Sequence, residues 1–187
     1  VHPYNSFEVI NASYDNYGQV DLDIKKVYSD EDIKVLNDKV DKVIKSKINK
    51  KMSDKKRIEV IHDYIINNGK YATDKIRKKN PDKSYNKAND ILIDHVGLCS
   101  AYADAMAIFL YEFGIDNYKI ASTNHVWNLV KVNKKWLHLD LTWDDPITKT
   151  GVQKLEKIFL LIDNDELKEL KVSQHKFNDN VYKEALN

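Results

Sequence analysis

The chain has 187 residues, of which 42% are hydrophobic and 32% charged, and this suits one domain with its own core. Its 30 basic and 29 acidic residues leave a net charge of +1, so charge gives no reason to expect a nucleic acid or an anionic membrane as a partner. The single cysteine, Cys99, excludes an internal disulfide and a metal site built from cysteines. No stretch approaches the roughly 18 apolar residues that a membrane span needs.

Residues 1–28 are interpreted as an N-terminal extension. Apolar and polar residues alternate weakly at 6–10 and 20–24, which predicts either a short hairpin packed on the domain or a linker from an upstream module. The chain starts at Val1 rather than Met, which favours a trimmed or mature form. We therefore expect an extracellular or cell-surface bacterial protein whose leader has been removed. A cytoplasmic location is the alternative, because a lone cysteine also suits a reducing compartment.

Helices are predicted for the first half of the remaining chain. Ser29 and Ser53 are typical helix N-caps, and each is followed by apolar residues on one helical face. Small apolar residues after Cys99 predict a buried helix that ends at Gly114. Residues 70–87 are rich in turn-forming and basic residues, which predicts a long, mobile surface loop. The predicted helices span residues 29–48, 53–68, a short segment from 88 toward 97, and 99–113.

The second half predicts an antiparallel sheet. Asn133 and Lys134 separate two alternating segments and are interpreted as a tight two-residue turn. A short helix follows the sheet at 163–170, and the polar tail beyond Ser173 is expected to drape over the surface. The predicted strands span residues 118–121, 125–132, 135–141 and 157–162. Helices followed by a compact antiparallel sheet predict an α+β domain over residues 29–187.

Cys99 is the first candidate for chemistry because it opens a predicted helix after Gly97 and Leu98. A helix N-terminus presents free amide groups and a partial positive charge, both of which favour a thiolate, the nucleophilic form of cysteine. The same amides can bind an oxyanion after a carbonyl is attacked. The alternative is that Cys99 is an inert, buried small hydrophobic residue.

A base and an orienting carboxylate can be sought from the register of the predicted hairpin. With a two-residue turn, Val132 pairs with Lys135, and Asp140 then lies opposite Trp127. His125 and Asp140 come out as diagonal neighbours on one face, close enough for their side chains to meet. This predicts a Cys99, His125 and Asp140 triad.

Other histidines compete with this interpretation or lack a role. His138 shares the face of Asp140 and is a rival base, but it pairs with Leu129, farther from the strand end. Trp127 is expected to cover the His125–Asp140 pair, with a plain core position as the alternative. His62, His95 and His175 lack partners at ligand spacing, and no metal or nucleotide motif is present. We therefore expect no metal and no cofactor.

Three ordered segments resemble the motif blocks of transglutaminase-like domains, within the superfamily of transglutaminases and papain-like cysteine proteases. These blocks are Gly97-Leu98-Cys99-Ser100-Ala101-Tyr102-Ala103, His125-Val126-Trp127-Asn128 and Trp136-Leu137-His138-Leu139-Asp140-Leu141-Thr142-Trp143. The Asp144-Asp145-Pro146 that follows is similar to many bacterial members. The resemblance covers about residues 55–170 and implies a papain-like fold with Cys99 as nucleophile, His125 as base and Asp140 as orienter.

The implied chemistry is a thioester formed at a protein or peptide amide, with ammonia or an amine leaving. The acyl group then passes to an amine in cross-linking, or to water in deamidation or proteolysis, so the expected partner is a protein or peptide that offers a Gln or Lys side chain or a peptide bond. Ser100 departs from the aromatic residue that many members have after the cysteine. Tyr71 is the candidate side-chain donor to an oxyanion, and Leu98, Ser100 and Trp127 are further candidates for substrate binding. The alternative function is a non-catalytic binding or scaffolding module.

Overall fold

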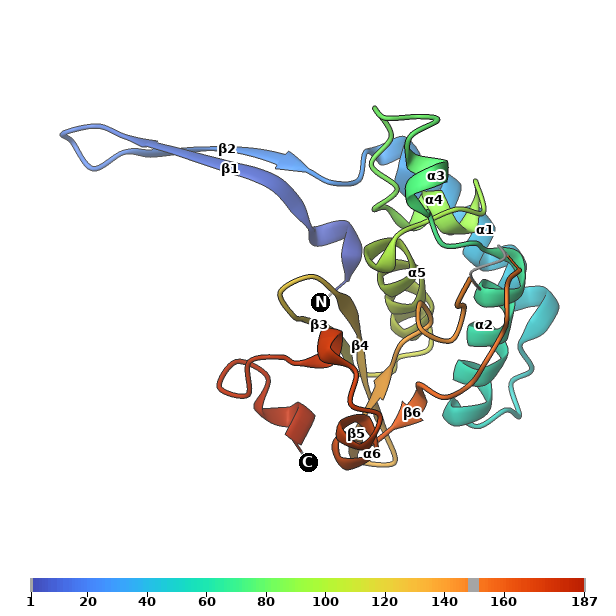
Figure 1. Cartoon of the computed structure of the whole chain (residues 1–187). Helices are drawn as coiled ribbons and strands as arrows, with labels where there is room; N and C mark the ends of the chain where they lie inside the picture. Colours follow the sequence, from blue (N-terminus) through green and yellow to red (C-terminus); the bar gives the residue numbers. More distant parts are fainter. Residues whose placement is uncertain (1, 148–151, 187) are drawn as a thin grey trace.

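The computed structural model describes residues 2–147 and 152–186, and its central element is helix α5 (Cys99–Glu112). This helix lies between the other helices and a four-stranded antiparallel sheet, so the α+β class is as predicted (Figure 1). Every residue from Ala101 to Leu110 is buried. Because many of these residues are alanines, neighbouring elements approach the helix closely on all sides. None of the described helices is long and apolar enough to cross a membrane.

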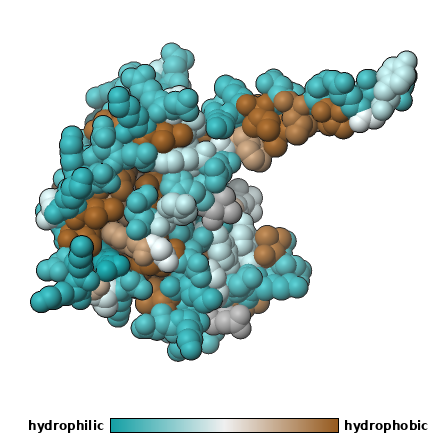
Figure 2. Space-filling view, turned by 180° about the vertical axis from the view of Figure 1, so that it is seen from behind, coloured by the Kyte–Doolittle hydropathy of each residue, from teal (hydrophilic) through white to brown (hydrophobic). Residues whose placement is uncertain are grey.

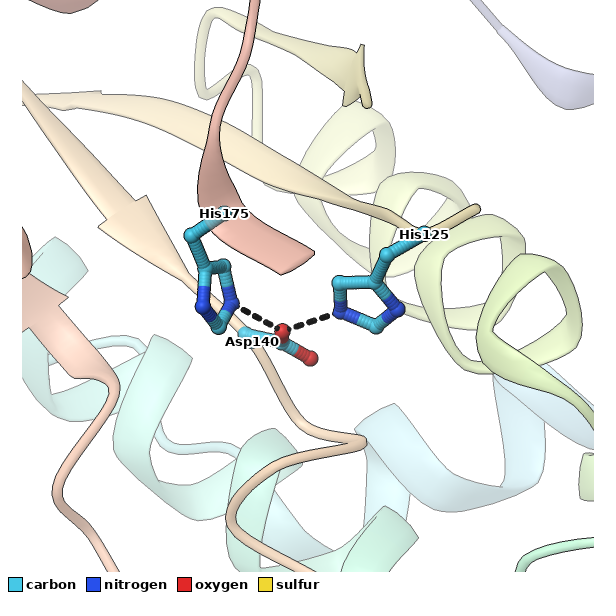
Figure 3. Close-up of side chains that lie close together, drawn as sticks. All are labelled: His125, Asp140 and His175. Carbon is cyan, nitrogen blue, oxygen red and sulfur yellow. Dashed lines mark hydrogen bonds and ion pairs between the residues drawn. The ribbon is translucent and has the colours of Figure 1, made fainter. Parts of the chain in front are cut away.

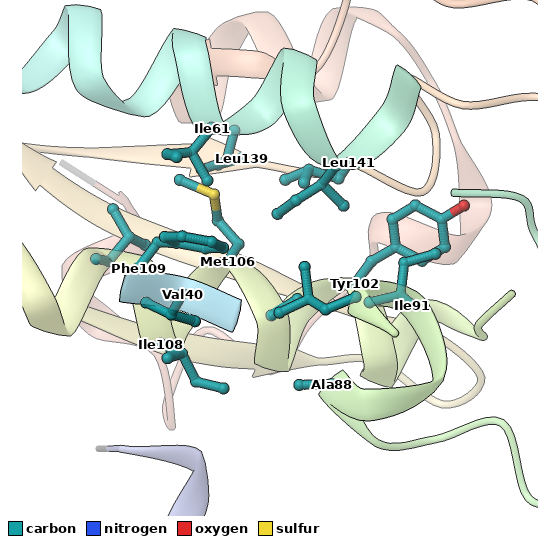
Figure 4. Close-up of a cluster of buried hydrophobic side chains, with 14 of the residues drawn as sticks. Val40, Ile61, Ala88, Ile91, Tyr102, Met106, Ile108, Phe109, Leu139 and Leu141 are labelled. Carbon is teal, nitrogen blue, oxygen red and sulfur yellow. The ribbon is translucent and has the colours of Figure 1, made fainter. Parts of the chain in front are cut away.

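The two longest helices start where the sequence predicts them, because each has a serine cap. In α1 (Asp30–Lys47) the Ser29 Oγ accepts from the Asp32 amide at 3.1 Å, while the Asp32 carboxylate accepts from the Ser29 amide at 3.0 Å. In α2 (Asp54–Asn68) the Ser53 Oγ accepts from the amide of Lys56 at 3.3 Å. Apolar faces of these helices and of α4 (Ala88–Leu92) pack around α5 and form the main core (Figure 4).

The sheet has the order β3-β4-β5-β6 and confirms the predicted hairpin register. Val132 pairs with Lys135, and Leu129 pairs with His138. Asn133 and Lys134 both have positive φ, at 52° and 69°, as a tight turn matched to the twist of its strands requires. The strands are β3 (Asn117–Ala121), β4 (Val126–Val132), β5 (Lys135–Leu139) and β6 (Leu160–Ile162).

Two strands are shorter than predicted because buried carboxylates bind the backbone in place of the sheet. After Leu139 the chain turns, since Asp140 Oδ1 accepts from the amides of Thr142 and Trp143 at 2.9 and 3.3 Å. Residues 157–159 lie outside the fourth strand, where the amide of Phe159 donates to Asp144 Oδ1 at 2.9 Å. The turn after β5 therefore places Asp140 at the end of the sheet.

The N-terminal segment contains the predicted hairpin, but the expectation that it packs on the domain is wrong. After a short turn, η1 (Pro3–Asn5), the strands β1 (Phe7–Tyr14) and β2 (Val20–Lys26) pair and project away from the other elements (Figure 1). Every residue of both strands is exposed, and apolar side chains gather along the arm (Figure 2). The alternation of apolar and polar residues comes from pairing within the hairpin, not from contact with a core.

Two segments predicted as surface are anchored more firmly than the sequence indicates. Residues 70–87 include α3 (Asp74–Arg77), the buried Tyr85 and a parallel bridge between Tyr71 and Gly97. After α6 (Asn164–Glu169), the tail forms the turns η2 (Ser173–His175) and η3 (Lys183–Leu186), and Phe177 bridges to Ser122 beside β3. Most residues of the tail are exposed, as expected for a segment on the surface, but the buried His175 and Ala185 anchor it beside the sheet.

Candidate active site

Cys99 is the first residue of α5 and is half-buried, so it is not sealed in the core. A Cβ on Gly97 would lie 2.7 Å from the Ala101 side chain, which explains why a glycine stands at this close turn into the helix. Burial raises the pKa of the Cys99 thiol, but a hydrogen bond with His125 and the backbone amides of Val126 and Ser100 outweigh burial. The net effect holds the pKa below its ordinary value.

His125 lies immediately before β4 and connects Cys99 with Asp140. Its Nε2 is 2.5 Å from Asp140 Oδ2, and its other ring nitrogen is free of this contact (Figure 3). Burial alone would lower the pKa of His125, yet the hydrogen bonds with Asp140 and Cys99 raise it to about 9. The two shifts together favour a thiolate paired with an imidazolium.

Asp140 is held by four donors from three segments of the chain. Its Oδ1 accepts from two backbone amides of the turn, and its Oδ2 accepts from His125 and from His175 Nε2, the latter at 2.8 Å. Burial raises the pKa of the carboxyl group, but the hydrogen bonds from the two histidines lower it to about 2. The carboxylate is thus ionised and fixed.

His175 is a site residue that the sequence analysis missed, and the expectation that it lacks a partner is wrong. It comes from η2 and is 5% exposed, with its imidazole beside that of His125 (Figure 3). No spacing rule joins it to Asp140, because the contact depends on how the tail returns to the sheet. His62 was also expected to lack a partner, yet its Nε2 lies 3.1 Å from Asp144 Oδ2.

Trp127 and His138 form a layer behind His125. The Trp127 ring stacks on His125 at 5.7 Å between ring centres, and its Nε1 donates to His138 Nδ1 at 3.0 Å. Trp127 is 1% exposed, so it covers the imidazole from the protein side and also serves as core. Burial lowers the pKa of His138 to about 4. This rival base therefore has Trp127, not Cys99, as its partner.

A cleft of about 350 Å³ opens beside the histidine that faces Cys99. Its walls come from the segment after α2, the start of β4, the turn after Asp140 and the tail. The lining residues are Tyr71, Thr73, Asn124, His125, Thr142, Trp143, Asp145, Pro146, Ile147 and Gln174. The wall combines apolar surface with several polar side chains, which is typical of a binding site.

The four residues predicted for substrate or oxyanion binding lie in different places. Tyr71 lines the cleft, and burial together with the nearby charge of Cys99 raises the pKa of its hydroxyl group. Trp127 lies behind the cleft, Leu98 is the N-cap of α5, and Ser100 donates to Asn86 at 2.7 Å.

Asp145 and Gln174 were not predicted to line the cleft. Gln174 Oε1 accepts from Trp143 Nε1 at 3.2 Å, which joins the tail to the cleft wall. Gln174 could not have been found from the sequence for the same reason as His175: the path of the tail decides its position.

Within residues 2–147 and 152–186, one group of three side chains brings possible metal-binding atoms within 4.8 Å of one another, and it consists of His125, Asp140 and His175. Their facing atoms are already joined by two hydrogen bonds. In the observed geometry, the Asp140 carboxylate orients the imidazoles of His125 and His175.

The family model of the transglutaminase-like superfamily matches residues 41–141, more than half of the chain. Among solved structures, a protein described as a TGase aligns with a TM-score of 0.54 at 16% identity, over 79% of this chain and 47% of that one. A candidate cysteine protease from Cytophaga hutchinsonii aligns with a TM-score of 0.44 at 15% identity, over 79% of this chain and 65% of that one. The chain spans less than two thirds of either, and the first likeness shows a shared fold. A search of curated protein sequences finds no match.

Proposed function

Because the chain belongs to the transglutaminase-like superfamily, we propose that it is a cysteine-dependent enzyme that attacks an amide carbonyl of a protein or peptide through Cys99. The observation that carries this proposal is the position of His125, whose Nε2 lies 2.5 Å from Asp140 Oδ2 and whose interaction with Cys99 lowers the pKa of the thiol. A nucleophile, a base that interacts with it and a carboxylate that orients the base are the parts that nucleophilic acyl transfer requires.

In the proposed first half-reaction, the Cys99 thiolate adds to the carbonyl carbon and the carbonyl oxygen becomes an oxyanion. The amides of Ala101 and Tyr102 already donate to the Leu98 carbonyl. The amides of Cys99 and Ser100, at the very start of α5, are therefore the proposed backbone donors. The Tyr71 hydroxyl group at the cleft is the proposed side-chain donor. When the tetrahedral intermediate collapses, the C–N bond breaks, the leaving nitrogen takes the proton from His125, and a thioester remains on Cys99.

In the second half-reaction, neutral His125 takes a proton from the acceptor, which is an amine or water. The acceptor adds to the thioester, and collapse of the second intermediate breaks the C–S bond and releases the thiolate beside His125, which already carries the acceptor's proton as an imidazolium. Asp140 stays ionised throughout, which is consistent with its pKa of about 2, and keeps the ring aligned. An amine acceptor gives cross-linking, whereas water gives deamidation or proteolysis.

The test compares the wild type with Cys99→Ala on glutamine peptides and a labelled amine. Amine incorporation, ammonia release and peptide cleavage are followed in the same samples. We expect at least one product from the wild type and none from the variant, and the product identifies the acceptor. If neither protein gives a product and the thiol titrates like that of a free cysteine, the chain is a non-catalytic module with this fold.

A further inference from the structure

We propose that His175 is a positioning residue of this site, which holds the Asp140 carboxylate in place and shares its charge with His125. The inference rests on the proposed function, since it concerns the same reaction. His175 touches neither sulfur nor substrate in this arrangement and would act through Asp140. It lies outside residues 41–141, the part of the chain that matches the family model, so the match does not supply it.

Asp140 receives one of its hydrogen bonds from His175. The residue is 2% exposed, and its Oδ2 accepts from His125 at 2.5 Å and from His175 at 2.8 Å. A buried carboxylate is stable in its ionised form only when donors replace the lost water. His175 provides one of four such donors, and without it the carboxylate would have one donor fewer and one restraint fewer.

Aromatic side chains enclose the His175 ring and hold it in place. It stacks on Phe159 with 4.9 Å between ring centres and an angle of 22°, and it meets Trp127 edge-on at 4.9 Å. Trp143 lies 5.7 Å away on another side. A ring enclosed in this way has few alternative rotamers, so its Nε2 stays directed at Asp140.

The segment that carries His175 is attached to neighbouring elements on both sides of this residue. Gln174 accepts from the Trp143 indole at 3.2 Å, and the Ala121 amide at the end of β3 donates to the Tyr182 hydroxyl group at 3.2 Å. Phe177 bridges to Ser122 between these points. The position of the donor to Asp140 is therefore tied to the strands that carry His125.

Because His125 and His175 both donate to Asp140 Oδ2, His175 affects the charge that His125 experiences. While His175 donates to Asp140, part of the carboxylate charge is compensated, and the attraction that stabilises the His125 imidazolium is reduced. Replacing His175 with a side chain that cannot donate should strengthen this attraction and keep His125 protonated to higher pH. The charged and titratable groups around the pair are Cys99, Tyr71, His138 and Asp163, with Lys168, Lys171, Lys176 and Asp179 around a hollow next to His175.

The test measures the rate of Cys99 alkylation by iodoacetamide as a function of pH. Because the chain has one cysteine, the thiol signal comes from Cys99 alone. An ion pair gives two inflections: the lower one marks formation of the thiolate, and the upper one marks loss of the His125 proton. The variants are His175→Phe, which keeps an aromatic ring without a donor, and His175→Gln, whose amide reaches the position of Nε2. Phe177→Leu is the matched control, because it removes packing from the same segment without touching Asp140.

For His175→Phe we expect the upper inflection to move up by about one pH unit, and turnover to fall about tenfold through kcat rather than KM. His175→Gln should keep the upper inflection and the turnover near those of the wild type. Phe177→Leu should lower the melting temperature and leave the inflection and the turnover unchanged. If His175→Phe does not fold, His175→Asn replaces it, since its shorter amide does not reach Asp140. An upper inflection that does not move in His175→Phe would overturn the role of His175. The same holds if His175→Gln and Phe177→Leu lose turnover to the same extent. An ordinary thiol titration in the wild type would instead contradict the proposed function.

Discussion

His62 Nε2 lies 3.1 Å from Asp144 Oδ2, and both side chains are fully buried. This pair joins α2 to the turn that follows Asp140, and the other oxygen of Asp144 accepts from the Phe159 amide. Asp144 therefore holds the turn from two directions, four residues after the carboxylate that orients His125.

We expect Asp144→Ala to destabilise the protein by about 2–4 kcal/mol, because it leaves a buried imidazole and a buried amide without their partner. Urea unfolding followed by circular dichroism measures this change. The control is Lys157→Ala, which breaks the exposed ion pair with Asp63 and should cost less than about 0.5 kcal/mol. Equal midpoints for both variants would contradict the structural role assigned to Asp144.

His125 and His138 lie near each other around Trp127, yet only one of them is expected to serve the thiol. His125→Asn should abolish turnover and return Cys99 to the slow alkylation of an ordinary thiol at about pH 6, since the pairing that lowers the thiol pKa is lost. His138→Gln should retain fast alkylation, although it weakens packing beside Trp127. Alkylation followed by intact mass distinguishes the two, and the reverse pattern would make His138 the base.

Tyr71 is expected to act on the oxyanion and not on the thiol. Tyr71→Phe should leave the alkylation rate of Cys99 unchanged and lower kcat about 10-fold to 100-fold, because a donor that acts only in the transition state is removed. Steady-state kinetics on the best glutamine peptide measures this split. A higher KM at constant kcat would instead assign Tyr71 to substrate binding.

The raised pKa of Asp145 predicts that the stability of the protein depends on pH in a specific way. Burial raises its pKa to about 6, against the hydrogen bonds from Tyr102 and Gln153 that oppose the shift. Because the folded-state pKa lies above that of the unfolded chain, the contribution of Asp145 to stability is fully present below about pH 4 and is lost as pH rises through 6.

Asp145→Asn should therefore be more stable than the wild type at about pH 7.5, by about 1–3 kcal/mol, with little difference near pH 4. Thermal unfolding at the two pH values measures the comparison. Asp140 cannot produce this pattern, because its pKa is lowered to about 2 and its contribution is lost only as pH falls below about 4. A variant that loses stability at the higher pH would show that the Asp145 hydrogen bonds outweigh its charge.

The turn and cap residues in the sequence were enough to predict the hairpin that brings His125 toward Asp140 and the starts of α1 and α2. The turn at Asn133 and Lys134 fixes the pairing of β4 with β5, and this pairing brings His125 toward Asp140. The serine caps likewise fixed the starts of α1 and α2. No periodicity describes how an irregular tail returns to the sheet, so His175 and Gln174 were not found. The alternation of apolar and polar residues in the N-terminal hairpin correctly predicted two strands. It did not indicate whether these strands pack on the domain.

The contact between His175 and Asp140 joins residues 35 positions apart and depends on a segment that follows the sheet and α6. Closing the chain between two such residues costs conformational entropy, which the contacts of the docked tail must offset. A chain that has built its helices and sheet but has not docked this segment would hold Asp140 with one donor missing. Because loss of this donor is expected to lower turnover about tenfold, full turnover would require the docked tail.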